Sequence, residues 1–230
     1  MHKVVFIFGI SGGLGSALRQ AFIARGDKVY GGSRNQSSDQ SEASSNYIVD
    51  VSSESDMRKL IERLRGKGVV PDLVINCSGI MEKALLMVTE GQRFENIMKT
   101  NVMGSFLINR EFLRLMLPKK KSLIIHFSSI HVKAASVGTG VYSASKSAVE
   151  TLTRVFDNEL KGMNVRIRCI ALSYVENLGM TNEIDPENIT KALALAKTGR
   201  VVPFAEVFQT IIDLNDGNYA NDDPIISIGL

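Results

Sequence analysis

The sequence has few of the features that mark secreted, metal-binding or disulfide-bonded proteins. It contains only two cysteines, Cys77 and Cys169, which lie far apart and within apolar stretches. We therefore expect buried free thiols in a reducing compartment rather than a disulfide. No group of His, Cys and carboxylate residues has the spacing of metal ligands, so no metal is predicted.

Neither sign of charge dominates, and no long hydrophobic run is present. The 27 Lys and Arg residues against 24 Asp and Glu residues leave a formal net charge of +3, which is too small to indicate nucleic-acid binding. The basic run Lys119-Lys120-Lys121 is short and is typical of a solvated loop. Without an apolar run of about 18 residues, no membrane-spanning helix is predicted. The apolar run after Met1 passes into glycines without a cleavage site, which favours a first strand over a signal peptide. We therefore expect a cytoplasmic location.

Short apolar runs alternate along the chain with segments of helical periodicity. We expect strands at Val4–Phe8, Lys28–Tyr30, Tyr47–Val49, Leu73–Ile75, Ser122–Phe127, Val165–Ala171 and Ile225–Ile228. We expect helices from Leu14 to before Gly26, at Ser53–Arg65, within Phe94–Leu117, at Tyr142–Lys161 and at Ala205–Leu214, and a polar loop at Gln36–Ser45. This alternation predicts a doubly wound, Rossmann-type parallel α/β sheet with helices on both faces, in a single domain spanning residues 1–230.

A glycine-rich turn follows the first expected strand and opens the first helix. It comprises Gly9-Ile10-Ser11-Gly12-Gly13-Leu14-Gly15. Glycine permits positive φ and close approach of another backbone, and a helix N-terminus offers N–H groups and a partial positive charge to a pyrophosphate. A tight turn without a ligand would also explain the glycines. Their position in the first strand–helix unit favours dinucleotide binding.

The end of the second expected strand indicates which dinucleotide binds. NAD sites usually carry an acidic residue about 20 residues after the turn. Here the segment is Gly31-Gly32-Ser33-Arg34-Asn35, which contains no acid. The Arg34 guanidinium suits a 2′-phosphate, although a solvated loop arginine would fit the same sequence. We predict NADP(H) rather than NAD(H).

Tyr142 and Lys146 lie four residues apart at the start of an expected helix, and therefore on one helical face. A nearby ammonium stabilises phenolate, which makes a tyrosine a better proton donor at neutral pH. The pair alone is common by chance. Ser128-Ser129 and Asn76-Cys77-Ser78-Gly79 end two other expected strands, where open α/β sheets bind ligands. Asn101 lies in a helical stretch, where asparagine is unfavourable.

In order and spacing, these motifs resemble the short-chain dehydrogenase/reductase family of the small single-domain type. The motifs are Gly9-x-x-x-Gly13-x-Gly15, Asp50-Val51, Asn76-Cys77-Ser78-Gly79, Asn101, Ser129 and Tyr142-x-x-x-Lys146. The resemblance implies an NADP(H)-dependent oxidoreductase that transfers a hydride between nicotinamide and a small-molecule carbonyl or alcohol substrate. It also implies that Tyr142 is the general acid or base and that Lys146 holds the nicotinamide ribose and acidifies the tyrosine. Ser129 would bond the substrate oxygen, and Asn101 would hold a water in a proton relay.

The resemblance also implies a set of cofactor contacts. Asp50 and Val51 would flank the adenine, and Asn76 and Gly79 would lie along the ribose side. The full set of expected cofactor-binding residues is Gly9, Ser11, Gly13, Leu14, Gly15, Ser33, Arg34, Asp50, Val51, Asn76, Ser78, Gly79, Tyr142, Lys146, Val175 and Asn177.

The chain departs from the family pattern at three places. Phe8 precedes the glycine turn where a threonine is usual, and Ser78 replaces an alanine. After the sixth strand, relatives carry a proline–glycine pair, whereas this chain reads Ala171-Leu172-Ser173-Tyr174-Val175-Glu176-Asn177. That change puts the backbone shape beside the nicotinamide in question.

Residues 178–202 form the expected substrate-loop region. The helix-like Ile189–Ala196 either covers an apolar pocket or packs on the sheet. In relatives the C-terminal segment often helps to form a tetramer, so we expect a homo-oligomer, either a dimer or a tetramer.

His126, inside the fifth strand, is predicted to be a hydrogen-bonded core residue, whereas His131 either edges the substrate pocket or is structural.

A non-catalytic NADP(H)-binding sensor or scaffold is the main alternative function. An epimerase or dehydratase is a further, less favoured alternative, because such enzymes usually carry a larger substrate domain. The sequence leaves the substrate open, because such pockets are built from variable loops.

Overall fold

The computed structural model describes residues 2–34, 44–119, 121–176, 178, 186–195, 200–219 and 221–230. Within them, seven parallel strands form one sheet in the order β3-β2-β1-β4-β5-β6-β7. The strands are β1 (Val4–Phe8), β2 (Lys28–Ser33), β3 (Ser44–Ile48), β4 (Leu73–Asn76), β5 (Ser122–Ser129), β6 (Val165–Leu172) and β7 (Ile225–Ile228). The strand order reverses direction between β1 and β4, which places a crevice at their carboxyl ends.

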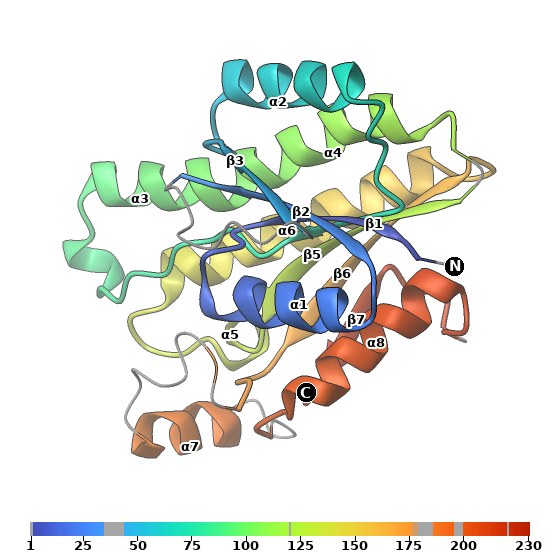
Figure 1. Ribbon diagram of the computed structural model, residues 1–230. Helices are drawn as coiled ribbons and strands as arrows, with labels where there is room; N and C mark the ends of the chain where they lie inside the picture. Colours follow the sequence, from blue (N-terminus) through green and yellow to red (C-terminus); the bar gives the residue numbers. More distant parts are fainter. Residues whose placement is uncertain are drawn as a thin grey trace.

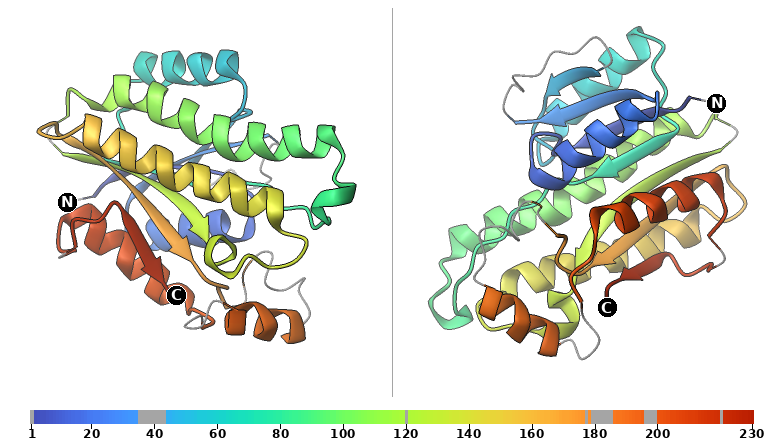
Figure 2. Two further views of the ribbon diagram at one scale, coloured as in Figure 1. Left: turned by 180° about the vertical axis from the view of Figure 1, so that it is seen from behind. Right: turned by 60° about the horizontal axis from the view of Figure 1, so that its bottom comes forward.

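Helices cover both faces of this sheet, as Figures 1 and 2 show. The helical elements are α1 (Gly13–Ala24), α2 (Glu54–Gly66), the 3₁₀ turn η1 (Leu86–Val88), α3 (Gly91–Met98), the π-helix η2 (Lys99–Met103), α4 (Gly104–Met116), α5 (His131–Ala134), α6 (Gly140–Glu159), α7 (Pro186–Leu195) and α8 (Phe204–Asp216). Helices α2, α4 and α6 lie on one face, and α1 and α8 on the other. The predicted doubly wound parallel α/β fold is confirmed.

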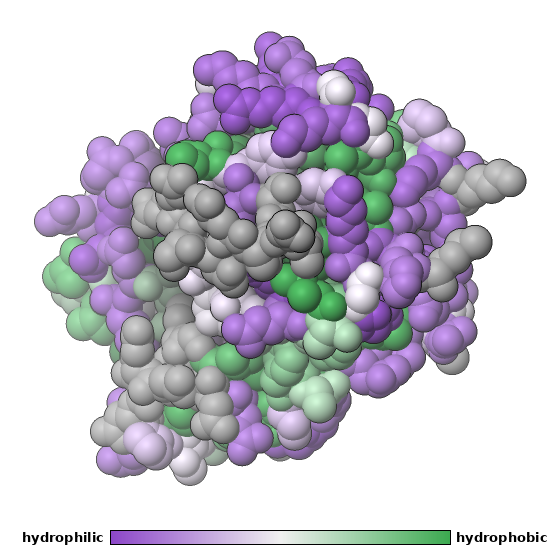
Figure 3. Space-filling model, viewed as in Figure 1, coloured by the Kyte–Doolittle hydropathy of each residue, from purple (hydrophilic) through white to green (hydrophobic). Residues whose placement is uncertain are grey.

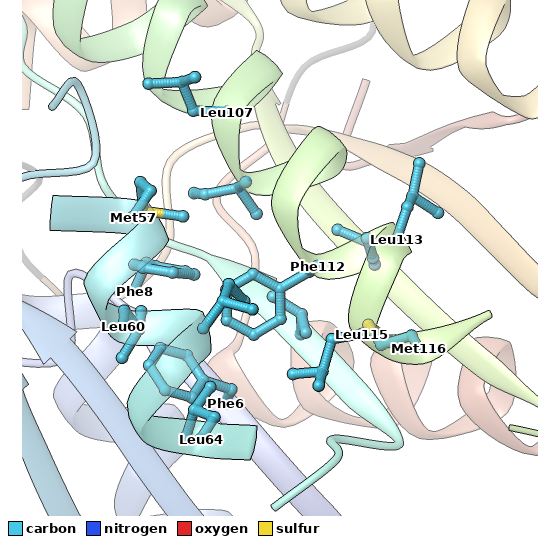
Figure 4. Close-up of a cluster of buried hydrophobic side chains, with 14 of the residues drawn as sticks. Phe6, Phe8, Met57, Leu60, Leu64, Leu107, Phe112, Leu113, Leu115 and Met116 are labelled. Carbon is cyan, nitrogen blue, oxygen red and sulfur yellow. The ribbon is translucent and has the colours of Figure 1, made fainter. Parts of the chain in front are cut away.

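The core on the α2–α4 face is built around aromatic side chains of β1 (Figure 4). The ring of Phe112 on α4 lies 5.2 Å from Phe6 and 5.4 Å from Phe8, measured between centroids. Leu60 and Leu64 of α2 close the same cluster and are almost completely buried. A second cluster on the opposite face joins α1 and α8 to the other side of the sheet. Burial on both faces explains why the strands are continuous apolar runs.

Polar residues define the ends of α2 and its outer face. The Ser53 hydroxyl accepts a hydrogen bond from the backbone N–H of Asp56, which caps the helix. Acidic residues occupy the first turn and basic residues the last, the arrangement that the helix dipole favours. The outer surface over α2, at the top of Figure 3, is correspondingly hydrophilic.

Several strands are longer than the apolar pattern predicted. β2 extends to Ser33 rather than Tyr30, β5 to Ser129 rather than Phe127, and β3 begins at Ser44 rather than Tyr47. The reason is that parallel pairing continues beyond the apolar side chains, as in the register of Ser129 with Leu172. The added residues are glycines, serines and Asn46, which continue the strand pairing without contributing to the apolar pattern. The extensions of β2 and β5, at the carboxyl ends of these strands, carry polar residues up to the crevice.

The expected helical stretch Phe94–Leu117 is three joined elements, α3, η2 and α4, which form one continuous rod in Figure 2. In the parts of the chain that the structure describes, no helix is long and apolar enough to cross a membrane.

Candidate active site

Two adjoining cavities lie along the carboxyl ends of the strands. The larger has a volume of about 280 Å³ and extends from the glycine turn to β5 and β6. The smaller, of about 210 Å³, lies over the ends of β2 and the segment after β3. Both are lined by Gly12, Cys77, Ser78 and Gly79, so they are two parts of one cleft.

The glycine turn lies between the two cavities, and its glycines are required by close backbone packing. A Cβ atom on Gly15 would lie 2.2 Å from the carbonyl oxygen of Gly9. Gly9 has a φ of +68°, and a Cβ there would lie 2.8 Å from the backbone nitrogen of Ser78. The residue before α1 is Gly12, which has no side chain that could cap the helix. It therefore provides no side-chain acceptor for the backbone N–H groups in the first turn of α1. This turn fits a pyrophosphate.

The smaller cavity collects the residues predicted for the adenosine half of a dinucleotide. Ser33, Arg34, Asp50 and Val51 all line it. Arg34 is exposed at the end of β2, and no acidic residue lies among residues 31–34. The Asp50 carboxylate accepts hydrogen bonds from the backbone N–H and hydroxyl of Ser52, at 2.9 and 2.8 Å. The cationic side chain at the end of β2 is therefore open to a phosphate.

The larger cavity brings together Ser129, Tyr142 and Lys146. Tyr142 and Lys146 lie in the first two turns of α6, and the Lys146 Nζ atom is 5.6 Å from the centroid of the Tyr142 ring. The same ammonium donates a hydrogen bond of 2.9 Å to the carbonyl oxygen of Phe127 on β5. The predicted pairing of phenol and ammonium on one face is thus present. Such an arrangement of a hydroxyl, a phenol and an ammonium can bind and protonate a carbonyl oxygen.

Ser129 is the last residue of β5, and its hydroxyl is held by the next turn. The backbone N–H of His131 donates to Ser129 Oγ at 3.3 Å. Because that oxygen accepts this bond, its own proton is available to donate elsewhere.

Asn101 lies behind the cleft rather than on its surface. It is 1% exposed and lies in the π-helix η2, a feature that often marks functional sites. Its side chain accepts from the backbone N–H of Ile80 at 2.9 Å and donates to Ile80 O at 3.0 Å and Ser145 Oγ at 2.9 Å. A Cβ on Gly79 would lie 3.4 Å from Asn101 Oδ1 and 3.5 Å from Lys146 Nζ. The amide and the ammonium therefore approach the same glycine.

The buried histidine of β5 supports the strand end that carries Asn76. His126 Nδ1 lies 3.2 Å from Asn76 Nδ2, and His126 Nε2 lies 2.7 Å from Asn109 Oδ1. The neutral tautomer with a proton on Nε2 satisfies both contacts. Burial, followed by the charge of Lys146, lowers the pKa of His126 to about 3. The prediction of a hydrogen-bonded core histidine is confirmed.

Both cysteines are free thiols; Cys169 is buried, as predicted, whereas Cys77 is only partly buried because it lines the cleft. Burial raises the pKa of Cys77 and of Cys169 to about 12, so both remain protonated. Cys77 lines the cleft as a neutral group.

The segment after β6 continues in extended form without the proline–glycine pair. Ser173 N donates to Ile228 O at 3.1 Å, and Val175 pairs with Val202 in an isolated parallel bridge. Val175 lines the larger cavity, as predicted. Asn177, residues 36–43 of the expected polar loop, Ala196 and much of the expected substrate-loop region lie outside the described residues.

Helix α7 lies beside α5. Its Ile189 and Leu193 pack against Ile130, Ala134 and Tyr174, two of which line the larger cavity. The segment Ile189–Ala196 was expected either to cover an apolar pocket or to pack on the sheet. Its described residues pack against residues that line the larger cavity.

Most of the residues predicted from the sequence line the cleft, but several other lining residues were not predicted. Gly9, Ser11, Gly13, Leu14, Gly15, Asn76, Ser78 and Gly79 line it together with the residues described above, whereas Asn101 lies just behind. The unpredicted lining residues include Met81, Thr100, Ile130, Leu172, Ser173, Tyr174 and Leu178. His131, which the sequence left open, and Ser128, which the sequence placed at a strand end where ligands bind, also line the cleft. For all of these except Thr100, which lies in η2, a position after or at the end of β4, β5 or β6 was the available signal. No group of three or more potential metal ligands occurs among the residues placed by the structure.

Comparison with known proteins adds independent evidence. The family model for short chain dehydrogenases matches residues 3–202. The chain is 35% identical to the NADPH-dependent pterin aldehyde reductase of Arabidopsis thaliana over 173 residues, covering 71% of this chain and 72% of that protein. It is 29% identical to carbonyl reductase family member 4 of Danio rerio over 226 residues, covering 95% and 93%. A short chain dehydrogenase of Leptospira borgpetersenii, solved with bound NAD+, superposes with a TM-score of 0.85 at 20% identity, covering 100% and 92%.

Proposed function

The chain belongs to the short chain dehydrogenase family of oxidoreductases, and on that premise we propose that it catalyses the NADPH-dependent reduction of an aldehyde or ketone. The observation that carries this proposal is the convergence of Ser129, Tyr142 and Lys146 in one cavity beside the glycine turn. Bound nicotinamide would supply or accept the hydride, and the protein would manage the substrate oxygen and its proton. The same arrangement supports the reverse oxidation of an alcohol.

In this proposal, Ser129 and Tyr142 hold the substrate oxygen from two sides. Ser129 Oγ accepts from the backbone N–H of His131 and directs its own proton to the substrate oxygen. Tyr142 donates the proton that neutralises the developing alkoxide during reduction and accepts it during oxidation. Both groups stabilise charge that develops in the transition state.

Lys146 and Asn101 support the proton donor. The Lys146 ammonium, fixed by the Phe127 carbonyl, places a positive charge near the Tyr142 ring and favours the release of the phenolic proton. It also provides N–H donors for a ribose hydroxyl. Asn101 supports the backbone at Ile80, and in the proposed relay it holds the water that returns a proton towards Lys146.

The proposed cofactor preference rests on the end of β2. Arg34 lines the adenosine-side cavity, where an acid that would bind the ribose hydroxyls of NAD is absent from residues 31–34. A guanidinium there favours the additional phosphate of NADPH. The relative at 35% identity is named as NADPH-dependent, which supports the same preference. Val51 and Asp50 would border the adenine, and the glycine turn the pyrophosphate.

The main rival proposal is a protein of the same fold that binds NADPH as a sensor or scaffold, without turnover. A sensor needs the glycine turn and Arg34 but has no use for a hydroxyl, phenol and ammonium at the far end of the cleft. The discriminating experiment follows NADPH absorbance at 340 nm (the nicotinamide band) with a panel of aromatic and aliphatic aldehydes and ketones. Substrate-dependent NADPH consumption is expected. Tight NADPH binding without consumption across the panel would support the sensor.

We also propose that residues 1–230 act as one domain within a homo-oligomer. Large apolar side chains are exposed near the outer end of α3, at the left edge of Figure 3, namely Leu85, Leu86, Met87, Val88 and Phe94. Exposed apolar groups of this kind are typical of surfaces that associate. Light scattering after size exclusion is expected to give the mass of a dimer or tetramer, and a monomer at micromolar concentration would contradict the proposal.

A further inference from the structure

His131 is bonded through both ring nitrogens and both backbone groups. Its Nδ1 atom lies 3.1 Å from Ser136 Oγ, and its Nε2 atom lies 3.3 Å from the hydroxyl of Tyr174. Its backbone N–H donates to Ser129 Oγ at 3.3 Å, and its carbonyl accepts from Ser143 Oγ at 3.1 Å. The position of the imidazole is therefore fixed relative to Ser129.

The imidazole joins two tyrosines into an aromatic wall. The His131 ring lies 6.1 Å from that of Tyr142 at an interplanar angle of 74°, and 5.8 Å from that of Tyr174 at 89°. All three residues line the larger cavity, and each is less than one-tenth exposed. The wall thus begins at the proposed proton donor and continues away from it along the substrate side of the cavity.

Both polar groups at the far end of this wall are uncharged. Burial, followed by the charge of Lys83, lowers the pKa of His131, and burial, followed by Tyr142, raises the pKa of Tyr174. A neutral imidazole has one donor and one acceptor nitrogen. When Nε2 donates to Tyr174, the phenolic proton is available to a ligand; when Nε2 accepts that proton, the phenolic oxygen still has a free lone pair. Either tautomer leaves the Tyr174 hydroxyl able to form one further hydrogen bond.

The remainder of the substrate side is mostly apolar, with Ser128 and Ser173 as further polar lining residues. Met81, Ile130, Leu172, Val175 and Leu178 line it, and Lys146 is the one permanently charged side chain among the described lining residues. The Lys146 ammonium is bonded to the Phe127 carbonyl. At the Tyr174 end of this wall a carboxylate or phosphate on the substrate would meet no charged lining side chain, because Lys146 lies beside Tyr142 and Lys83, whose charge acts on His131, does not line the cavity. The desolvation of such a group would be costly.

From this geometry we propose that His131 and Tyr174 form a recognition pair that selects uncharged, ring-containing aldehydes or ketones with a hydrogen-bonding atom on the ring. The inference rests on the proposed carbonyl reduction and names its substrate class. The ring would pack against the aromatic wall and the apolar side chains while its polar edge bonds the Tyr174 hydroxyl. The carbonyl at the opposite end would then reach Ser129 and Tyr142.

The test compares quinoline carbaldehydes with naphthalene-2-carbaldehyde, which has the same shape but lacks the ring nitrogen. The quantity measured is kcat/KM at saturating NADPH, for the wild-type protein and the variants Tyr174→Phe and His131→Leu. Tyr219→Phe is the matched control, because Tyr219 lies after α8 and does not line the cleft. Since the ring nitrogen also makes the aldehyde more electrophilic, the readout is the change in the quinoline-to-naphthalene ratio between proteins.

For at least one quinoline isomer, Tyr174→Phe and His131→Leu are expected to lower this ratio by about fivefold to tenfold, the loss of one neutral hydrogen bond. Thermal unfolding of Tyr174→Phe is expected to match that of the wild type, which shows that the variant is folded, and Tyr219→Phe should change neither the ratio nor the activity on naphthalene-2-carbaldehyde. If the ratio is the same in wild type and Tyr174→Phe for every isomer, the recognition pair is refuted while carbonyl reduction stands. If no aldehyde is reduced by the wild type, the proposed function and the inference both fail.

Discussion

The Nζ atom of Lys146 lies 5.6 Å from the centre of the Tyr142 ring, and a hydrogen bond to the Phe127 carbonyl holds it there. This relationship joins a helix to the neighbouring strand at the point where both reach the cleft. Among the residues that the structure describes, the hydrogen-bond partner of Nζ is a carbonyl oxygen rather than a carboxylate, so the positive charge stays beside the phenol.

Replacement of this charge should impair proton transfer. In Lys146→Met, we expect kcat for carbonyl reduction to fall by about 10²–10³-fold, the range typical of a lost acid–base group. NADPH affinity should also fall, because a donor to the ribose is removed. Steady-state kinetics and NADPH fluorescence titration check both results. Lys59→Met, at an exposed position of α2, is the control, and equal activity in the two variants would contradict the role of the ammonium.

Arg34 should decide the choice between the two nicotinamide cofactors. Arg34→Ala is expected to weaken NADPH binding by about 10–30-fold, the value of a charge-assisted bond to phosphate, and to leave NADH binding within about twofold. Dissociation constants for both cofactors at one moderate salt concentration provide the measurement. Arg58→Ala on the exposed face of α2 should leave both constants unchanged. A wild-type protein that binds NADH as tightly as NADPH would contradict the assignment.

The glycine turn offers a matched pair of substitutions. In Gly15→Ala, the new methyl group would lie 2.2 Å from the Gly9 carbonyl oxygen, so the turn must shift. We expect about 1–3 kcal/mol of lost stability and a marked loss of NADPH affinity. Gly66→Ala, at the end of α2, meets no atom within 4 Å and should stabilise the protein by about 0.5–1 kcal/mol. Urea unfolding and cofactor titration of both variants test this contrast; a fully stable Gly15→Ala protein that binds NADPH normally would argue against the close packing.

Acid should destabilise the protein through His126. Its pKa is lowered to about 3 in the folded chain from an ordinary 6.5, so between these values the unfolded chain binds a proton that the folded chain does not. The associated stability is fully present above about pH 6.5 and decreases as the pH falls towards 3. At pH 5 the loss is on the order of 2 kcal/mol.

The check compares urea unfolding at pH 7 and pH 5 for the wild type and His126→Gln. The substitution removes the titrating ring and keeps a donor for Asn109, so the loss on acidification should be smaller by about 2 kcal/mol. His131, whose pKa is also lowered, contributes in the same direction to both proteins. Exposed His2 provides the control variant, His2→Gln, which should behave as the wild type does. Identical pH dependence in wild type and His126→Gln would disprove the assignment.

Local patterns predicted the sheet well, because buried parallel strands such as Val4–Phe8 are apolar on both faces. They underestimated strand ends such as Ser33 and Ser129, where backbone pairing continues under small polar side chains. The π-helical geometry at Asn101 was also beyond reach, because it arises where α3 meets α4. Only its unusual residue type in a helix marked the position.

The polar strand ends and the glycine turn were predictable because their residue types suit ligand binding and because they directly follow expected strands. The Asn76–His126–Asn109 network and the contact of His131 with Tyr174 were not, because each joins elements that are distant in the sequence. Tyr174 could be found only through the pairing of β5 with β6, which places the segments after Ser129 and Leu172 side by side.

The most direct test of the proposed chemistry is Tyr142→Phe, which removes one oxygen atom from the cavity. The measurement is kcat/KM for aldehyde reduction alongside the NADPH dissociation constant, with Tyr219→Phe as control. We expect kcat/KM to fall by at least about 10³-fold while the dissociation constant stays within about threefold. A Tyr142→Phe protein that reduces aldehydes at the wild-type rate would contradict the account.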